Sequence, residues 1–365
     1  MSEIKNEDKI RVAITGAGRI GRAVFRAFYE YRSRFPHVQL VAMNDPHDFN
    51  TLVHLLRYDS VHGVLPFDIR LNESKHTLQI GQEHVRLFAS REPSQLPWAD
   101  LQIDCVLECT GRFKDYAGLG QHVTAGAKRV VLSAPAKGDL DATVVFGAND
   151  SILHTRHKIL SIGSCTTNAL APVLKVIQQV SPIEHCFFNT IHAYTKDQCL
   201  VDSHHSDLRR ARAAGQSIIP TKTGAAKTIS SVLPELDGRV QGYAVRVPTA
   251  NVSLLDMVVK LSSPVTEQEI HAVFSDVAKQ SPYIDVTNEP LVSCDFNHSP
   301  YSAVLDLSQT QVKDDSIRLV AWYDNEWAYA VRMLDMAQKF AVLQLGEGRV
   351  TLEENVSIQK ANYHG

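Results

Sequence analysis

The stretch "ITGAGRIGRAVF", residues 14–25, decides the fold. Its three glycines, Gly16, Gly18 and Gly21, form the pattern G-x-G-x-x-G. An apolar run typical of a buried strand precedes them, and a segment with apolar residues near a period of about 3.6 follows. Such glycines allow a tight turn, a close approach of the backbone to a pyrophosphate, and close packing of helix on sheet. The stretch therefore predicts a strand–turn–helix unit that binds a dinucleotide.

The next predicted strand, residues 38–45, ends in Asp45. A carboxylate at this position binds both ribose hydroxyls of NAD and repels the 2′-phosphate of NADP. The alternative is an ordinary glycine turn followed by a surface aspartate. The combination of strand, turn, helix and acid favours NAD binding.

Apolar strands and helical segments continue to alternate up to residue 165. This alternation predicts an α/β fold with a Rossmann-type, doubly wound parallel sheet. Two strands end in "ECTGRF" and "LSAP". Ligands of open α/β sheets bind at the carboxyl edge of the strands. Thr110, Gly111 and Ser133 are therefore candidates for contact with the cofactor, although each alone could be a plain turn residue.

The character of the chain changes after Ile183. Longer and partly alternating strands predict an antiparallel or mixed sheet, hence a second, catalytic domain of α+β type. The final amphipathic segment, residues 326–344, is expected to return to the first domain. We thus predict an NAD-binding domain over residues 1–164 and 326–365, and a catalytic domain over residues 165–325.

Composition excludes several classes of protein. The chain has 365 residues and a formal net charge of -3, without the basic bias of a nucleic-acid-binding protein. Its start lacks the apolar core of a signal peptide, and no apolar run approaches the roughly 20 residues that span a bilayer. These features predict a soluble cytoplasmic protein without membrane partners. The six cysteines and 16 histidines show no metal-binding spacing, so no metal is expected.

Cys165 lies in "SIGSCTTNALAPVLKVIQQV", where a predicted strand meets a predicted helix. A thiol at a helix N-terminus sees the positive end of the helix dipole, which favours the thiolate. The alternative is a cysteine that packs as a small apolar residue. His192, where a later strand meets a long polar segment, is the best candidate for a base. It could equally be an ordinary histidine at the end of a strand.

Four motifs carry a resemblance to a known family: "SCTTN", "TIHAYT", "LRRARAAGQSIIPTKTGAAK" and "WYDNEW". With them the chain resembles glyceraldehyde-3-phosphate dehydrogenase over nearly its whole length. The resemblance implies that Cys165 attacks an aldehyde, that His192 takes the proton, and that NAD takes the hydride. Inorganic phosphate then resolves a thioester into an acyl phosphate. A neighbouring His192 is also expected to form an ion pair with Cys165 that lowers the pKa of the thiol.

The resemblance also implies two anion sites and further contacts to the cofactor. For the substrate phosphate it implies Thr195, Asp197 and Arg246, with Asp197 orienting Arg246. For the attacking phosphate it implies Ser164, Thr166, Thr223 and Gly224. For the cofactor it implies Arg19, Ile20, Asn325 and Tyr329 in addition to the residues named above.

Residues 196–222 match the family's S-shaped loop, which in that family reaches the cofactor pocket of a neighbouring subunit in a homotetramer. A homotetramer is therefore expected here. The basic run "DLRRARA" within this loop could alternatively be a nucleic-acid patch, but it is short and the net charge is slightly negative.

Departures from the family pattern leave two questions open. Ser203 and His204 replace residues that help to exclude the 2′-phosphate in NAD-specific members, whereas Asp45 argues for NAD. Residues 291–312 look closer to a sister enzyme, D-erythrose-4-phosphate dehydrogenase, in which water resolves the thioester. The segments "HAYT" and "TKTGAAK" instead match the phosphorylating enzyme, which we therefore prefer.

Overall fold

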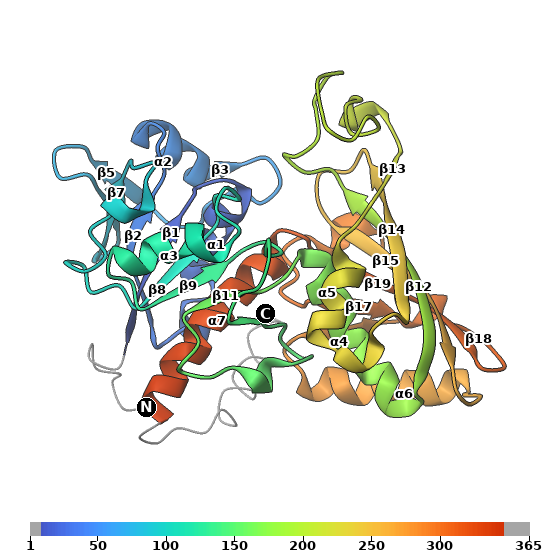
Figure 1. Ribbon diagram of the computed structural model, residues 1–365. Helices are drawn as coiled ribbons and strands as arrows, with labels where there is room; N and C mark the ends of the chain where they lie inside the picture. Colours follow the sequence, from blue (N-terminus) through green and yellow to red (C-terminus); the bar gives the residue numbers. More distant parts are fainter. Residues whose placement is uncertain (1–8, 347–365) are drawn as a thin grey trace. The chain divides into compact units, whose positions relative to one another are not determined.

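The computed structural model describes residues 9–346 and forms two compact units (Figure 1). Within the described chain, the first unit comprises residues 9–144, 151–163 and 330–346, and the second comprises residues 145–150 and 164–329. The grouping differs from the predicted domain boundaries by a few residues, such as the short segment 145–150. The ends of the predicted first domain, residues 1–8 and 347–365, lie outside the described residues. The boundaries and roles of the two domains remain predictions.

The first unit contains a sheet in the order β10-β11-β9-β8-β1-β2-β7-β6-β5. Every pairing from β10 to β7 is parallel, which confirms the predicted Rossmann-type fold. The strands are β1 (Ile10–Thr15), β2 (Val38–Asn44), β5 (Ile69–Asn72), β6 (Thr77–Ile80), β7 (Glu83–Phe88), β8 (Cys105–Glu108), β9 (Arg129–Leu132), β10 (Ala142–Thr143) and β11 (Ile159–Ser161).

Strands β5 and β6 extend this sheet in antiparallel fashion, and the sequence analysis did not anticipate them. Buried Ile69, Leu78 and Ile80 hold them to the core. The helices of this part are α1 (Arg19–Glu30), α2 (Phe49–Arg57) and α3 (Tyr116–Thr124), and a short two-stranded sheet joins β3 (Tyr58–Asp59) to β4 (Gly63–Val64). The parallel arrangement brings the ends of β1, β2, β8 and β9 to one edge, where the glycine turn lies.

The second unit contains a mixed eight-stranded sheet in the order β13-β14-β12-β15-β19-β17-β16, with β18 paired to β19. Its long central strands carry apolar side chains on alternate positions, so one face is buried. The strands are β12 (Ile183–Ala193), β13 (Ile219–Thr221), β14 (Val240–Val247), β15 (Ser253–Leu261), β16 (Ile284–Thr287), β17 (Ala303–Asp306), β18 (Gln311–Lys313) and β19 (Ser316–Tyr323). The predicted mixed sheet is confirmed.

Three helices cover the buried face of this sheet: α4 (Cys165–Val180), α5 (Ala225–Val232) and α6 (Glu267–Gln280) (Figure 1). Ile177, Ile229 and Phe274, one from each helix, lie in one core with residues of β12, β15, β17 and β19. Pro172 falls within α4, and the helix continues through it to Val180. The core therefore fixes α4, and with it the position of its first residue.

Helix α7 (Trp327–Gly346) begins in the second unit, and from residue 330 onwards it groups with the first unit. There Arg34 forms a bidentate ion pair with Asp335, and the guanidinium of Arg129 lies 4.8 Å from the ring centre of Phe340. The last helix thus forms part of the first unit's core. Across residues 9–346, no helix has both the length and the apolar content needed to cross a membrane.

Candidate active site

The three glycines of the first turn lie where side chains would not fit or would block a ligand. Gly16 has φ +84°, and a Cβ there would lie 2.5 Å from the backbone nitrogen of Thr110. A Cβ at Gly21 would lie 1.9 Å from the carbonyl oxygen of Gly16. At Gly18, by contrast, nothing of the described protein lies within 4 Å of that position. Open space over Gly18 at the N-terminus of α1 fits the close approach of a pyrophosphate.

Asp45 follows β2 and bends back onto this turn. Its Oδ2 accepts a hydrogen bond from the backbone nitrogen of Ala17 at 2.7 Å. Its Oδ1 contacts the backbone nitrogen of His47 at 3.1 Å and the ring Nδ1 of His47 at 2.5 Å. The carboxylate therefore lies beside the turn, as the sequence predicted. Arg19 and Ile20 open helix α1 next to Gly18, and Arg19 pairs with Asp59 at 2.5 Å.

The remaining cofactor candidates of the first unit lie at the same sheet edge. Thr110 and Gly111 follow β8, and Ser133 follows β9, where its backbone nitrogen donates to the carbonyl oxygen of Glu108 at 3.0 Å. The structure thus brings together the cofactor residues that the sequence predicted in this unit. Asn325 and Tyr329 belong to the second unit.

Cys165 is the first residue of α4, and His192 is the penultimate residue of β12. The Sγ atom of Cys165 lies 3.5 Å from Nε2 of His192, within hydrogen-bonding distance for sulfur. Ser164 caps the helix by accepting from the backbone nitrogen of Thr167 at 3.1 Å. A thiol and an imidazole 27 residues apart in sequence are therefore adjacent, in the arrangement of a nucleophile and its base.

The surroundings of these two side chains disfavour the expected ion pair. Burial raises the pKa of the Cys165 thiol, and the nearby Arg246 and the N-terminal contacts of α4 only partly oppose this. Burial, followed by the charge of Arg246, lowers the pKa of His192 to about 3. Desolvation thus disfavours the thiolate of Cys165 and the imidazolium of His192 alike.

Arg246 and the backbone compete for the second nitrogen of His192. Nδ1 of His192 lies 2.7 Å from the carbonyl oxygen of Ala193 and 2.7 Å from a terminal nitrogen of Arg246. That same guanidinium nitrogen also donates to Ala193 at 2.9 Å. A guanidinium can only donate, so a bond from Arg246 requires Nδ1 to accept and leaves the proton on Nε2; Nε2 carries the lone pair that a base needs only when Nδ1 donates to Ala193. Nε of Arg246 is buried without a hydrogen-bond partner, so this cation has donor capacity to spare.

The expected contact of Asp197 with Arg246 is absent in the described structure. Asp197 Oδ2 instead pairs with Arg210 at 2.5 Å, and His205 lies 3.5 Å from it. Arg210 also donates to the hydroxyl of Thr221 at 3.0 Å. Burial lowers the pKa of Arg246, and the charge of Arg210 adds to this effect. Sequence reasoning missed Arg210. Its position within the "LRRARA" run was the available signal.

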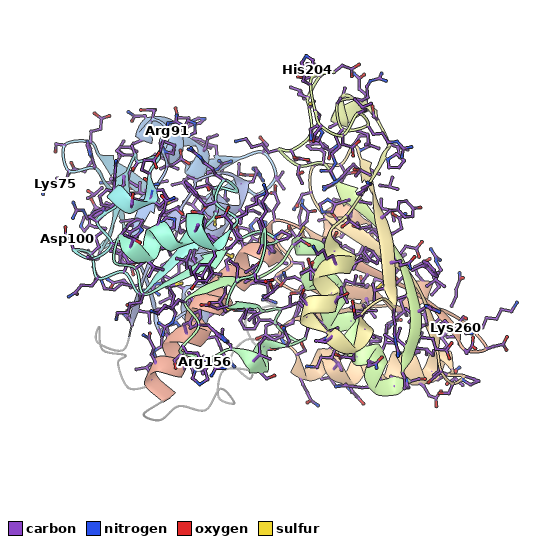
Figure 2. All side chains as sticks on the ribbon, viewed as in Figure 1. Lys75, Arg91, Asp100, Arg156, His204 and Lys260 are labelled. Atoms are coloured by element: carbon purple, nitrogen blue, oxygen red, sulfur yellow. The ribbon has the colours of Figure 1, made fainter. Side chains whose placement is uncertain are left out.

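Of the other predicted anion-site residues, Thr166 hydrogen-bonds to its neighbour Cys165. Thr195 follows β12, whereas Thr223 and Gly224 precede α5, with the Thr223 hydroxyl accepting from the backbone nitrogen of Ala225 at 3.3 Å. Residues 196–222 form a long loop with little regular structure, and Figure 2 shows His204 far out on it. Such a loop is typical of a functional segment rather than of a linker.

A buried tyrosine that the sequence analysis did not single out lies behind the pair. The hydroxyl of Tyr323 contacts the hydroxyls of Thr166 at 3.0 Å and Thr190 at 2.7 Å. Its ring meets the His192 ring edge-on, with centres 6.0 Å apart. Burial, followed by the proximity of Cys165, raises the pKa of Tyr323. Tyr323 stays a neutral phenol and fixes the first turn of α4 against β12. It stands within the quoted "WYDNEW" motif, which could have drawn attention to it.

Asn325 is held through a serine to the strand that carries His192. The Ser253 hydroxyl donates to Oδ1 of Asn325 at 2.7 Å and accepts from the backbone nitrogen of Ala193 at 3.1 Å. Because Oδ1 receives this bond, the amide nitrogen of Asn325 is the group available to donate to a ligand. Tyr329 is buried two residues into α7.

Comparison with known proteins gives a consistent result over both units. The family model described as the NAD binding domain of glyceraldehyde 3-phosphate dehydrogenase matches residues 10–116, and the model of the C-terminal domain of that enzyme matches residues 164–325. The chain is 46% identical over 334 residues to a glyceraldehyde-3-phosphate dehydrogenase of Pseudomonas aeruginosa, covering 91% of this chain and 98% of the relative. It is 47% identical over 338 residues to glyceraldehyde-3-phosphate dehydrogenase 2 of Bacillus subtilis, covering 91% and 97%. For the enzyme of Geobacillus stearothermophilus the identity is 44% over 336 residues, covering 91% and 98%.

Proposed function

The chain belongs to the glyceraldehyde-3-phosphate dehydrogenase family, and on this premise we propose that it oxidises D-glyceraldehyde 3-phosphate with NAD and inorganic phosphate to 1,3-bisphosphoglycerate. Membership makes it an NAD-dependent oxidoreductase. The observation that carries the proposal is the distance of 3.5 Å between Sγ of Cys165, at the start of α4, and Nε2 of His192.

Cys165 is the proposed nucleophile and His192 the proposed base. The thiol gives its proton to Nε2 of His192 as sulfur bonds to the aldehyde carbon, which yields a hemithioacetal. This step requires a neutral imidazole, and burial keeps His192 in that form; the same lowered pKa of about 3 makes His192 a weaker base. Bound at the proposed site, NAD would supply the acceptor for the hydride of that carbon, and a thioester would remain on Cys165. Phosphate then attacks the thioester carbon, and Cys165 leaves as the thiolate.

The proposed cofactor site has the shape and chemistry that NAD requires. Open space over Gly18 fits the pyrophosphate, and the carboxylate of Asp45 fits the two ribose hydroxyls. The amide nitrogen of Asn325 is free to donate to the nicotinamide carboxamide. The full proposed set is Gly16, Gly18, Arg19, Ile20, Gly21, Asp45, Thr110, Gly111, Ser133, Asn325 and Tyr329.

Two sites for phosphate are proposed around the reactive pair. Arg246, with Thr195 and Asp197, would hold the phosphate of the substrate, and the unpartnered buried Nε of Arg246 supports this role. Asp197 would act there through Arg210 rather than on Arg246 itself. Residues at the starts of α4 and α5 would hold the attacking phosphate through hydroxyls and backbone N–H groups: Ser164, Thr166, Thr223 and Gly224.

We also propose a homotetramer in the cytoplasm. Phe187 and Val258 are exposed cross-strand neighbours on β12 and β15, and Tyr243 on β14 is exposed as well. Large apolar side chains on the 196–222 loop are also exposed, among them Leu200 and Leu208. Apolar surface of this kind marks protein–protein interfaces. Light scattering measures the mass of the oligomer for the wild type and for Val258→Glu, and the variant is expected to have the lower mass. Lys260→Glu is the control.

A two-by-two assay tests the proposed reaction. NADH formation is measured with glyceraldehyde 3-phosphate or erythrose 4-phosphate, each with and without inorganic phosphate. The proposal expects the triose to be preferred and phosphate to be required. Preference for the tetrose, with equal rates in the absence of phosphate, would instead identify D-erythrose-4-phosphate dehydrogenase. The relatives named above are all glyceraldehyde-3-phosphate dehydrogenases.

A further inference from the structure

Glu108 is a fully buried carboxylate at the cofactor edge of the first unit. It ends β8, directly across from Thr15 at the end of β1. Its Oε2 accepts from the Thr15 hydroxyl at 2.6 Å and contacts Nε2 of His122 at 3.1 Å. Its Oε1 accepts from the backbone nitrogen of Thr110 at 2.8 Å and from the Thr110 hydroxyl. Two strand ends, a turn and a helix thus converge on one side chain.

The protonation of this cluster follows from Trp98. The indole nitrogen of Trp98 donates to Nδ1 of His122 at 3.0 Å. An indole N–H can only donate, so Nδ1 accepts and Nε2 of the neutral imidazole carries the proton. The two oxygens of Glu108 therefore contact four groups that can donate: the Thr15 hydroxyl, Nε2 of His122, and the backbone nitrogen and hydroxyl of Thr110. Glu108 is itself fully buried among them.

The turn that Glu108 holds is the one against which the glycine motif packs. The hydroxyl of Thr110 donates to Glu108 and accepts from the backbone nitrogen of Arg112 at 3.0 Å, so its hydrogen-bonding capacity is directed inward. The Cβ position of Gly16 lies 2.5 Å from the nitrogen of Thr110. Because the two backbones touch without intervening atoms, displacement of Thr110 would displace Gly16 as well.

We propose that Glu108 is a positioning residue for NAD binding: it holds Thr110, and through Thr110 the Gly16 turn, in the shape that receives the pyrophosphate. The inference deepens the proposed function and rests on it for the identity of the cofactor. Glu108 touches neither NAD nor the reacting atoms. Its effect is therefore on the affinity for the dinucleotide and not on the chemical step.

Glu108→Gln tests the proposal, since it keeps the shape and replaces one acceptor oxygen by an NH₂ donor. The new NH₂ group would face other N–H and O–H groups. His122 cannot become an acceptor at Nε2, because Trp98 donates to its Nδ1. The dissociation constants of NAD and of ADP-ribose are measured by fluorescence titration of the full chain. Both are expected to rise about tenfold or more, because a hydrogen bond to a charged group is lost. The value of kcat at saturating NAD is expected to stay near that of the wild type.

Glu92→Gln is the matched control, because this exposed glutamate in the same unit loses the same charge. Circular dichroism establishes that each variant is folded, and the alkylation rate of Cys165 without NAD is expected to be unchanged. A purely structural role would lower the melting temperature and leave the dissociation constants of the folded protein unchanged. That result would overturn the proposal.

Thr15→Val provides a second test if Glu108→Gln does not fold. It removes one of the four donors and is expected to raise the dissociation constant of NAD by a smaller factor. A folded Thr15→Val with the wild-type constant would overturn the proposal. A wild type that fails to bind NAD would refute the proposed function instead, so the two failures are distinguishable.

Discussion

Cys165 shows how burial and reactivity oppose each other at a single residue. A helix N-terminus favours the thiolate, but burial raises the pKa of this thiol. Burial therefore opposes ionisation of this thiol. Such a thiol needs a base within reach, and His192, whose Nε2 lies 3.5 Å from Sγ, is the base that we propose.

We predict that Cys165 of the protein without NAD is alkylated slowly at neutral pH. The rate of modification by iodoacetamide should rise with pH, with a midpoint above that of an ordinary cysteine thiol, because burial raises the pKa of Cys165. Mass spectrometry locates the modified residue, and Cys165→Ser gives the background from the other five cysteines. A midpoint below neutrality would contradict this prediction and support an ion pair between Cys165 and His192.

His192 makes a second prediction, on stability. Its pKa falls from about 6.5 in the unfolded chain to about 3 in the folded protein, so the unfolded chain binds more protons between these values. The free energy of unfolding contributed by His192 is therefore fully present above about pH 6.5 and declines as the pH falls towards 3. Urea unfolding of the wild type and of His192→Asn, between about pH 3 and about pH 6.5, measures this contribution to the free energy of unfolding. Equal pH slopes for the two proteins would contradict the burial argument.

At the scale of elements, sequence signals at helix starts explain most of the framework. Helix α6 begins with a capping box, in which Thr266 accepts from the backbone nitrogen of Glu269 at 3.2 Å and the Glu269 side chain accepts from that of Thr266 at 2.7 Å. The buried Phe274 and Ile270 then fix this helix on the sheet. Helix α4 begins with a single cap, in which the Ser164 side chain accepts from the backbone nitrogen of Thr167, directly before Cys165.

Thr266→Ala is expected to lower the free energy of unfolding by about 1 kcal/mol, because a backbone donor at the start of α6 loses its acceptor. The rate of NADH formation should not change, since the residue has no contact with the reactive pair in the described structure. Chemical denaturation measures the loss, and Thr266→Ser, which keeps the hydroxyl, should restore most of it. Full stability of Thr266→Ala would show that water replaces the cap.

At the scale of the whole molecule, binding of the cofactor should add to stability. NAD at about one hundred times its dissociation constant is expected to stabilise the folded protein by about 2.7 kcal/mol. NADP at the same concentration should stabilise it less, because the carboxylate of Asp45 repels the 2′-phosphate. Thermal melts with each dinucleotide compare the two stabilising effects. In Asp45→Ala, the difference between the melting temperatures with NAD and with NADP should be smaller. If NAD and NADP raised the melting temperature of the wild type equally, Asp45 would not have the role proposed here.

Local sequence was sufficient to predict what depends on near neighbours. The strand before Gly16, the helix after it and Asp45 at the end of the next strand predicted the first unit, because parallel strands bring their carboxyl ends to one edge. The motif around Cys165 and the position of His192 indicated a reactive pair. Strands β5 and β6 were not predicted, because they are short and contain few apolar residues.

The burial and the hydrogen-bond partners of the site residues are evident only from the tertiary structure. The sequence predicts Cys165 and His192 as reactive, but only the folded structure shows that His192 is buried, that Cys165 is half-buried, and that desolvation disfavours the charged forms of both. It likewise reveals that Asp197 pairs with Arg210, that Tyr323 joins α4 to β12, and that Glu108 holds the cofactor turn. Hydrogen bonds between residues distant in sequence and the desolvation of charges arise from the folded arrangement, so no local pattern of residues could have revealed them.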